Sequence, residues 1–449
     1  MKRLLPNLLV SVCIMLASSL HADITGLTDP INLLKQDKLG GELGGMRTSL
    51  ADHGVDLTVQ SVSDMLGNVS GGMARGGDYA GLVNIGLAAD FEKAVGWKGA
   101  TFKSTWLWLY GNSVSGQFAG NKMTSSGIYG TPTLRCYELW MQQNLFEDLL
   151  SLRAGQIALD TEFGIIGSES LFLNTTFGIS TGISFNLPNG GPTYPMATPG
   201  VRLALQPASW LVLRGALTQG NCFSQTDNLN GFNWNFGPAG GLLSMNEAEI
   251  SWGKDPSSKM LQGYVKGGFW IQSATASGET SLGTISSSYP TGLYNNGFYF
   301  GFDQQLYKVR EPDASTGNRG KSVAAEKAAV DSGKGLSSFS QLDFSPQAWS
   351  PCTFYADSGL IYTGLIPGRD RDKLGVAFAY AQMGPLCRSS GIQSGLPGCS
   401  YELLTEFSYS IRLTPAMALE PDIQYIIHPG GTQQYANALV VGFRAVIDF

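Results

Sequence analysis

The chain has 449 residues and a formal net charge of −6, and only 14% of its residues are charged, against roughly 25% in typical soluble domains. Glycine is frequent, with 58 residues, and aromatic residues make up 11% of the chain. The negative net charge argues against nucleic acid as a partner. The composition favours a β-rich protein that is either secreted or embedded in a membrane.

The first 22 residues are typical of a cleaved export signal. Lys2 and Arg3 precede an apolar stretch over 4–20, and Ala22 provides a small residue before the cut. We therefore expect a mature chain that begins near Asp23 and leaves the cytoplasm by the general secretory route. After the signal, the sequence has no apolar run of the roughly 18 residues that a membrane helix needs.

Residues 23–54 predict a short helical segment ahead of the strands. Asp29 and Pro30 suit the first turn of a helix, and GMRTSLADHG, over 45–54, predicts a second short helix that ends at Gly54.

From Val55 to Phe449 the side chains alternate between two faces, as they do in strands. In VRLALQPASWLVLRGAL, over 201–217, leucine and valine lie on one face, whereas Arg202 and Arg214 lie on the other. The last strand has one wholly apolar face, formed by Leu439, Val441, Phe443, Ala445, Ile447 and Phe449. A period of two with charges on one face only predicts strands.

The connections between these strands alternate in length. Short ones lie at 96–99, 144–148, 207–209, 367–373 and 414–416, and long ones at 112–132, 161–198, 220–241, 274–296 and 384–400. Short turns at one end and long loops at the other are typical of outer-membrane barrels. We count 16 strands, and an even number lets the sheet close without a free edge.

The predicted fold is therefore all-β: a 16-stranded antiparallel transmembrane β-barrel over 55–449. The helical segment 23–54 should lie at its periplasmic mouth, with Arg47 at the entrance to the pore. The polar, lysine- and alanine-rich stretch 308–335 is predicted to be a periplasmic insert.

No catalytic, cofactor or metal site is predicted. Outside the export signal, His53 and His428 are the only histidines of the sequence. Glu247 and Glu249 could be interpreted as a glycosidase pair, but as same-face neighbours on one strand they are better interpreted as polar lining. Of the five mature cysteines, Cys387 and Cys399 share one Gly/Ser-rich stretch and are predicted to pair, which leaves Cys136, Cys222 and Cys352 unassigned.

The inward face carries the candidate solute pathway. Arg153, Arg202 and Arg214 fall on three neighbouring predicted strands and would form one positive wall, flanked by Glu138 and Glu249. Guanidinium groups and carboxylates can donate to and accept from sugar hydroxyls, and an indole face offers sugars an apolar platform. Further pathway candidates are Trp270, Asp303 and Gln305. Trp106 and Trp108 are alternative stacking residues or belong to a lipid-facing girdle. The alternative for the charges is a scattered lining that is merely solvated.

Several stretches resemble the carbohydrate-selective porin family of Gram-negative outer membranes. They are LGGELGGMRTSLADHGVDL (39–57), RCYELWMQQ (135–143), RAGQIALDTEF (153–163), LFLNTTFG (171–178), YPMATPGVRL (194–203), GLIYTGLIPGRDRD (359–372) and LEPDIQYIIHPGG (419–431). The sequence departs from the family pattern in the 308–335 insert, in its extra cysteines and at 41–42.

The resemblance implies an outer-membrane channel that admits monosaccharides by diffusion through an eyelet containing arginines. It also implies that Phe449 is part of the signal recognised by the barrel-assembly machinery. The expected partners are small sugars and outer-membrane lipid, and the barrel is a monomer or a homotrimer. The alternatives are a general or ion-selective porin and, from another class, a secreted β-rich glycan-binding protein or glycosidase.

Overall fold

The computed structural model describes residues 36–236, 241–255, 260–273, 295–309, 333–345, 350–385 and 400–449, together with the backbone of 279–280 and 283–284. The barrel strands are β1 Val55–Gly72, β2 Gly76–Asp90, β3 Ala100–Gly111, β4 Thr133–Leu145, β5 Leu150–Ile157, β6 Thr198–Ala208, β7 Leu211–Gln219, β8 Leu242–Trp252, β9 Gly263–Gln272, β12 Asn295–Lys308, β13 Gly335–Phe344, β14 Cys352–Thr363, β15 Lys373–Met383, β16 Tyr401–Thr414, β17 Met417–Ile427 and β18 Ala436–Asp448.

The remaining elements are short. They are the α-helices α3 Met46–Asp52, α4 Phe91–Val95 and α5 Thr181–Ser184, the π turn η2 Ser115–Ala119, the 3-10 turns η3 Leu159–Thr161, η4 Gly167–Leu171, η5 Thr175–Phe177, η6 Pro188–Gly190 and η7 Pro429–Gly431, and the two-stranded ladder β10 Glu279–Thr280 with β11 Gly283–Thr284. In the described part of the chain, no helix is long and apolar enough to cross a membrane.

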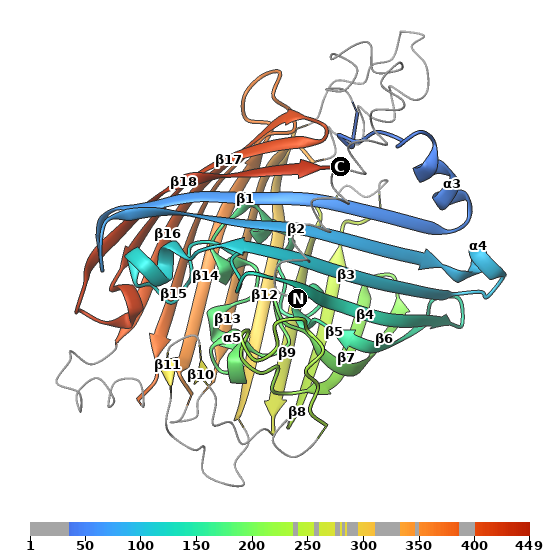
Figure 1. Ribbon diagram of the computed structural model, residues 1–449, viewed down its shortest axis with the longest axis horizontal. Coiled ribbons are helices and arrows are strands. Elements are labelled where there is room, and N and C mark those ends of the chain that lie inside the picture. Colours follow the sequence, from blue (N-terminus) through green and yellow to red (C-terminus); the bar gives the residue numbers. More distant parts are fainter. Residues whose placement is uncertain are drawn as a thin grey trace, which may run out of the picture.

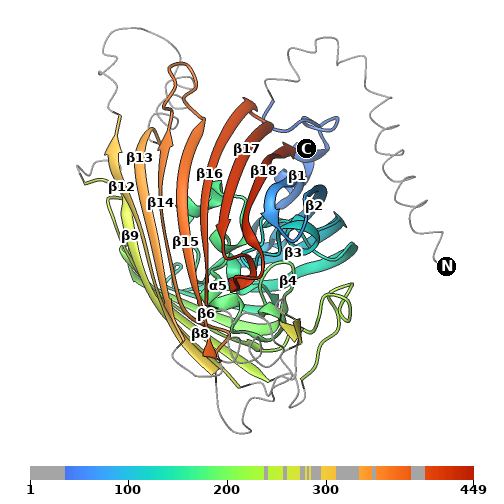
Figure 2. The same cartoon turned by 90° about the vertical axis from the view of Figure 1, so that its left-hand side faces the viewer.

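Sixteen strands of the described chain close into one antiparallel barrel, which confirms the predicted fold (Figures 1 and 2). Closure occurs between the first and last strands, where Asp64 of β1 lies opposite Arg444 of β18. Because a closed sheet has no unpaired edge, every strand can satisfy its backbone hydrogen bonds inside a membrane.

The outer face carries the apolar set predicted by the period of two. On β12, Phe298, Phe300 and Phe302 are exposed, whereas Tyr299 between them is completely buried inside the barrel. On β18, Phe443 is exposed and Val440 is buried, so the apolar face of the last strand points outward. We assign the end with short turns, which also holds the C-terminus, to the periplasmic side.

The short helix α3 lies at this periplasmic end, as predicted. Arg47 of α3 donates from Nη1 to the carbonyl oxygen of Leu57 at 2.9 Å and from Nη2 to the oxygen of Phe449 at 2.5 Å. Arg47 therefore ties the helix to both ends of the barrel chain. The predicted helix near Asp29 lies outside the described residues.

The long connection between β5 and β6, residues 158–197, folds back into the barrel instead of standing above it. Figure 2 shows its helix α5 within the ring of strands. The buried apolar side chains of this inserted segment, Leu159, Phe163, Ile166, Leu171, Phe172, Leu173, Phe177, Ile179, Ile183, Phe185 and Leu187, pack in two clusters against the inner wall.

Glycines of the wall make this packing possible. A Cβ atom at Gly301 would lie 2.4 Å from Cδ1 of Ile166, and one at Gly375 would lie 2.6 Å from Cδ2 of Leu171. Any larger residue at these two positions would force these side chains of the segment to shift, which gives a structural reason for part of the high glycine content.

Carboxylates of the wall hold the inserted segment by its backbone. Glu406 accepts from the N–H groups of Leu173 at 2.5 Å and Asn174 at 3.3 Å, and Glu247 accepts from the N–H of Gly164 at 2.8 Å. Asp303 accepts from the N–H and the hydroxyl of Ser168 at 2.9 and 3.0 Å. Acidic wall residues therefore fix the segment at three separate points.

Candidate pore constriction

Two of the predicted arginines lie directly opposite each other on neighbouring strands. Arg153 of β5 is the register partner of Arg202 of β6, and both side chains point into the barrel. They share one carboxylate of the inserted segment: Glu162 lies 2.9 Å from Nη2 of Arg153 and 2.7 Å from Nε of Arg202. One acidic loop residue thus sits between two wall cations.

Two further wall residues orient this pair. The amide oxygen of Gln142 accepts from Arg153 Nη2 at 2.9 Å and from Arg202 Nη2 at 2.8 Å. The guanidinium of Arg153 also lies over the ring of Trp140, 3.9 Å from its centroid, within the range of a favourable cation–π contact. The planar guanidinium groups are therefore held in a fixed geometry.

The third predicted arginine belongs to a separate ion-pair group. Arg214 of β7 donates from Nη1 to Glu247 at 2.8 Å and to Glu249 at 3.0 Å. Lys266 of β9 lies 3.7 and 3.8 Å from the same two carboxylates. Lys254 also lies 3.5 Å from Glu249, so this group has two acids and three bases, and each base is paired with a carboxylate.

The structure thus places the three arginines on neighbouring strands but does not form a positive wall. Each guanidinium is paired with a carboxylate, because the inserted segment supplies Glu162 and β8 supplies Glu247 and Glu249. The side chains of Glu162 and Arg214 remain 21% and 19% exposed, whereas that of Arg202 is only 5% exposed. The accessible lining is therefore of mixed sign.

Glu138 also lies on the inward face but is largely covered. Its carboxylate lies 2.9 Å from Nζ of Lys103 and accepts from Nε1 of Trp140 at 3.1 Å. The Lys103 side chain is 39% exposed and Glu138 only 2%, so it is the lysine that a solute in the lumen would meet.

The predicted stacking role of Trp270 does not fit its position. The side chain points inward but is only 1% exposed, because the inserted segment covers it with Phe163, Ile179 and Ile183. Trp106 and Trp108 are paired with Ile85 and Val83 of the lipid-facing side of β2, which places them in the outer girdle.

Asp303 and Gln305 lie on the inward face of β12. Asp303 anchors Ser168 of the inserted segment, and the backbone N–H of Gln305 bonds to the oxygen of Gln262 at 2.8 Å. The main contact of Asp303 is therefore with the inserted segment, and its contact with the lumen is secondary.

Sequence reasoning missed Glu162, Gln142 and the Asp64–Arg444 pair. Arg444 donates to Asp64 at 2.7 and 2.9 Å, across the closure between β18 and β1. The opposite signs of these inward residues were visible in the sequence, but the register that joins the two chain ends was not. Glu162 lies in a long loop, and no local pattern indicates that this loop enters the barrel.

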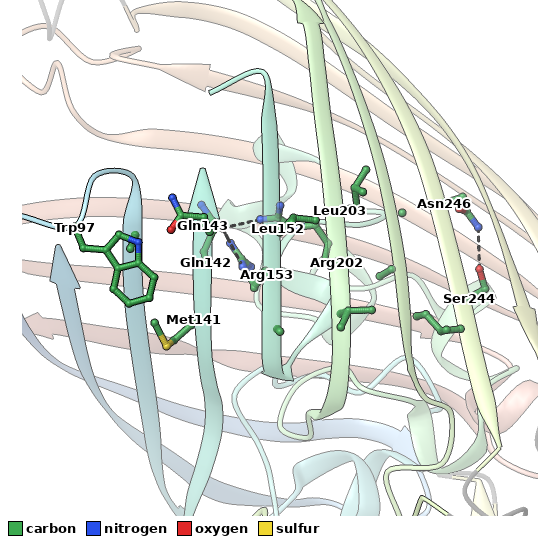
Figure 3. Close-up of a pocket in the computed structure, with 16 residues that line it drawn as sticks. Trp97, Met141, Gln142, Gln143, Leu152, Arg153, Arg202, Leu203, Ser244 and Asn246 are labelled. Carbon is green, nitrogen blue, oxygen red and sulfur yellow. Dashed lines mark hydrogen bonds between the residues drawn. The ribbon is translucent and has the colours of Figure 1, made fainter. Parts of the chain in front are cut away.

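A groove of about 760 Å³ on the wall between β3 and β8 is not the pore (Figure 3). It is lined by Trp97, Met141, Leu152, Val201, Leu203 and Leu217, all of which are on the exposed, lipid-facing side. Gln142, Arg153 and Arg202 also contact the groove. Their polar groups, however, point to the other side of the wall and bond to one another inside the barrel.

Metal and disulfide chemistry add nothing to this site. Within the described ranges, no group of three or more His, Cys, Asp or Glu side chains could hold a metal ion. Cys136, Cys222 and Cys352 are buried free thiols. The predicted Cys387–Cys399 pair lies outside the described residues.

The comparison with protein families decides the identity. The model of the carbohydrate-selective porin family, the OprB family, matches residues 74–449. The chain belongs to this family. The closed barrel and the family together identify it as a carbohydrate-selective porin of the Gram-negative outer membrane and favour a channel over the secreted soluble alternatives.

Relatives of this porin match it over nearly the whole chain. Porin B of Pseudomonas aeruginosa is 25% identical over 433 residues, covering 90% of this chain and 89% of its own. A putative porin, QuiX, of Acinetobacter baylyi is 23% identical and covers 91% of this chain and 92% of its own. The high-pH structure of Pseudomonas putida OprB superposes with a TM-score of 0.77 at 22% identity, covering 92% of this chain and 99% of that one, and supports the fold.

Proposed function

We propose that this porin admits uncharged monosaccharides and similar small polar solutes by passive diffusion, past a constriction formed by Arg153, Glu162, Arg214 and Lys103. The observation that carries the proposal is that the partly exposed cations in this part of the lumen are paired with carboxylates. Every accessible cation lies within 4 Å of a carboxylate.

Paired charges suit a neutral polyol better than an ion. Each guanidinium keeps N–H groups that can donate to hydroxyls, and each carboxylate keeps lone pairs that can accept from them. A sugar can therefore exchange its bonds to water for bonds to the wall with little net change in free energy. An ion gains little attraction from a balanced pair and loses part of its hydration.

The inserted segment sets the size limit in this proposal. Because it packs against the inner wall and supplies Glu162, only the space that it leaves open conducts. Disaccharides should then pass more slowly than monosaccharides.

Single-channel recording with sugars as blockers tests the proposal. Arg214→Ala should weaken block by glucose severalfold and shift ion selectivity towards cations, because Glu247 and Glu249 would lose one of their three nearby cations and retain Lys266 and Lys254. Leu213→Ala, the neighbouring residue on the lipid face, is the matched control and should change neither.

If glucose block survives in Arg214→Ala while only ion selectivity changes, the arginine is an electrostatic feature and sugars bind elsewhere. If glucose and maltose permeate equally fast through the wild-type channel, a general porin replaces the monosaccharide proposal.

A further inference from the structure

The motif GLIYTGLIPGRDRD, over 359–372, lies far from the constriction. It forms the end of β14 and the turn that leads to β15, at the same end of the barrel as the C-terminus (Figures 1 and 2). Asp372 organises this turn: it accepts from Arg369 Nε at 2.7 Å, from the Tyr409 hydroxyl at 2.7 Å and from the Arg412 N–H at 3.0 Å. The turn is thereby fixed to β16.

A cavity of about 290 Å³ lies beside this turn, lined by Thr363, Asp370, Arg371, Lys373, Arg412 and Pro415. Three of the lining side chains are cationic. Asp370 is the acid among these described lining residues, and its carboxylate lies 3.0 Å from Nζ of Lys334. The lining residues thus include three cationic side chains and one acidic one, and the acidic one is already paired with Lys334.

The cavity belongs to the inner side of the wall. Lys373 and Arg412 directly precede Leu374 and Leu413, which are 40% and 53% exposed on the lipid-facing side. By alternation, the two cationic side chains point towards the lumen. A solute that leaves the channel on the periplasmic side therefore passes this lining.

We propose that this cavity binds the anionic group, a carboxylate or a phosphate, of a monosaccharide-sized solute at the periplasmic mouth. Arginine presents a planar set of donors that matches both oxyanions, and lysine adds a compact positive charge. The Thr363 hydroxyl can bond to the neutral part of such a solute. This site goes beyond the proposed passage of neutral sugars and requires only that the chain forms a channel.

High salt concentration distinguishes direct binding at this cavity from long-range attraction by the charges of the pore mouth. At 1 M ionic strength the Debye length is about 3 Å, against about 10 Å at 0.1 M. Attraction by distant charges is then screened, whereas direct contact between an anion and Arg371 or Lys373 is reduced much less.

The experiment measures single-channel block of the full-length porin in 1 M KCl by glucuronate, glucose 6-phosphate and glucose, added to each side in turn. We expect glucuronate or glucose 6-phosphate to block from one side at a concentration at least tenfold lower than glucose. Whichever of the two anions blocks at the lower concentration shows whether the cavity prefers a carboxylate or a phosphate.

The double variant Arg371→Gln/Lys373→Gln should weaken anion block at least tenfold and leave glucose block unchanged. Its matched control is Lys93→Gln/Lys98→Gln, which removes two exposed cations around the β2–β3 turn at the same end. Equal block by all three solutes in the wild type, or equal loss in both double variants, would overturn the site. Anion block that is retained in Arg371→Gln/Lys373→Gln would also overturn it, whereas anion block without any glucose block in the wild type would contradict the proposed function alone.

Discussion

On the inward face of β16, Leu404 and Glu406 are completely buried beneath the inserted segment, whereas Ser410 and Arg412 of the same face are partly or fully exposed. On β15, Ala377 and Ala379 are likewise buried, whereas Lys373 lines the periplasmic cavity. Along β15 and β16, the extracellular half of the inner wall is thus packed against the inserted segment, whereas the periplasmic half is charged and partly exposed.

This difference shows that an inward-facing residue of a barrel can be either buried and apolar or exposed and charged. Small and apolar inward residues accept a covering segment, and charged inward residues keep water or solute beside them. Four changes would break or sharpen this comparison, taken from the largest expected effect to the smallest.

Leu404→Arg places a longer, charged side chain in the packed half and should destabilise the barrel by about 3–5 kcal/mol, because apolar burial is lost and the charge is removed from water. Ser410→Arg, on the same face in the open half, should stay within about 0.5 kcal/mol of the wild type. Urea refolding titrations, followed by heat-modifiable migration in gels, measure both. Similar costs for the two variants would contradict the division into halves.

Gly375→Ala should cost about 1–3 kcal/mol through overpacking, since the new Cβ would lie 2.6 Å from Leu171 and 2.8 Å from Phe172. Gly86→Ala, where the nearest atom is Cβ of Thr58 at 3.6 Å, is the control and should be neutral. The same refolding titration applies, and a neutral Gly375→Ala would show that the segment does not need this close approach.

Asp303→Ala removes the two bonds to Ser168 and should cost about 1–2 kcal/mol. Because the bonds hold the inserted segment against β12, open-channel conductance should rise and its noise should increase. Gln305→Ala, two residues along the same face, should leave both unchanged. Unaltered conductance in Asp303→Ala would mean that Glu247 and Glu406 suffice to hold the segment.

Glu162→Gln should have the smallest effect on stability, about 1 kcal/mol, because the amide oxygen can still accept from one of the two largely buried guanidinium groups while the charge is lost. It leaves Arg153 and Arg202 without their shared counter-ion, so selectivity should shift towards anions. The zero-current potential in a tenfold KCl gradient measures the shift. A shift towards cations, or none, would place Glu162 outside the conducting path.

The amino-acid sequence by itself determined the strands, their faces and the closure. The alternation that places Phe443 outward and Arg444 inward is a local property, because successive side chains of any strand point to opposite sides. Counting short and long connections was enough to predict sixteen strands, and the inward position of Arg202 followed from its neighbours Val201 and Leu203.

Only the tertiary structure decided what covers each inward residue. The burial of Trp270, the sharing of Glu162 by Arg153 and Arg202, and the pairing of Asp64 with Arg444 all join parts of the chain that are far apart in sequence. Such contacts depend on how the segment 158–197 folds into the barrel and on the register at closure. Both are set by packing between distant surfaces, for which the period of a single strand carries no information.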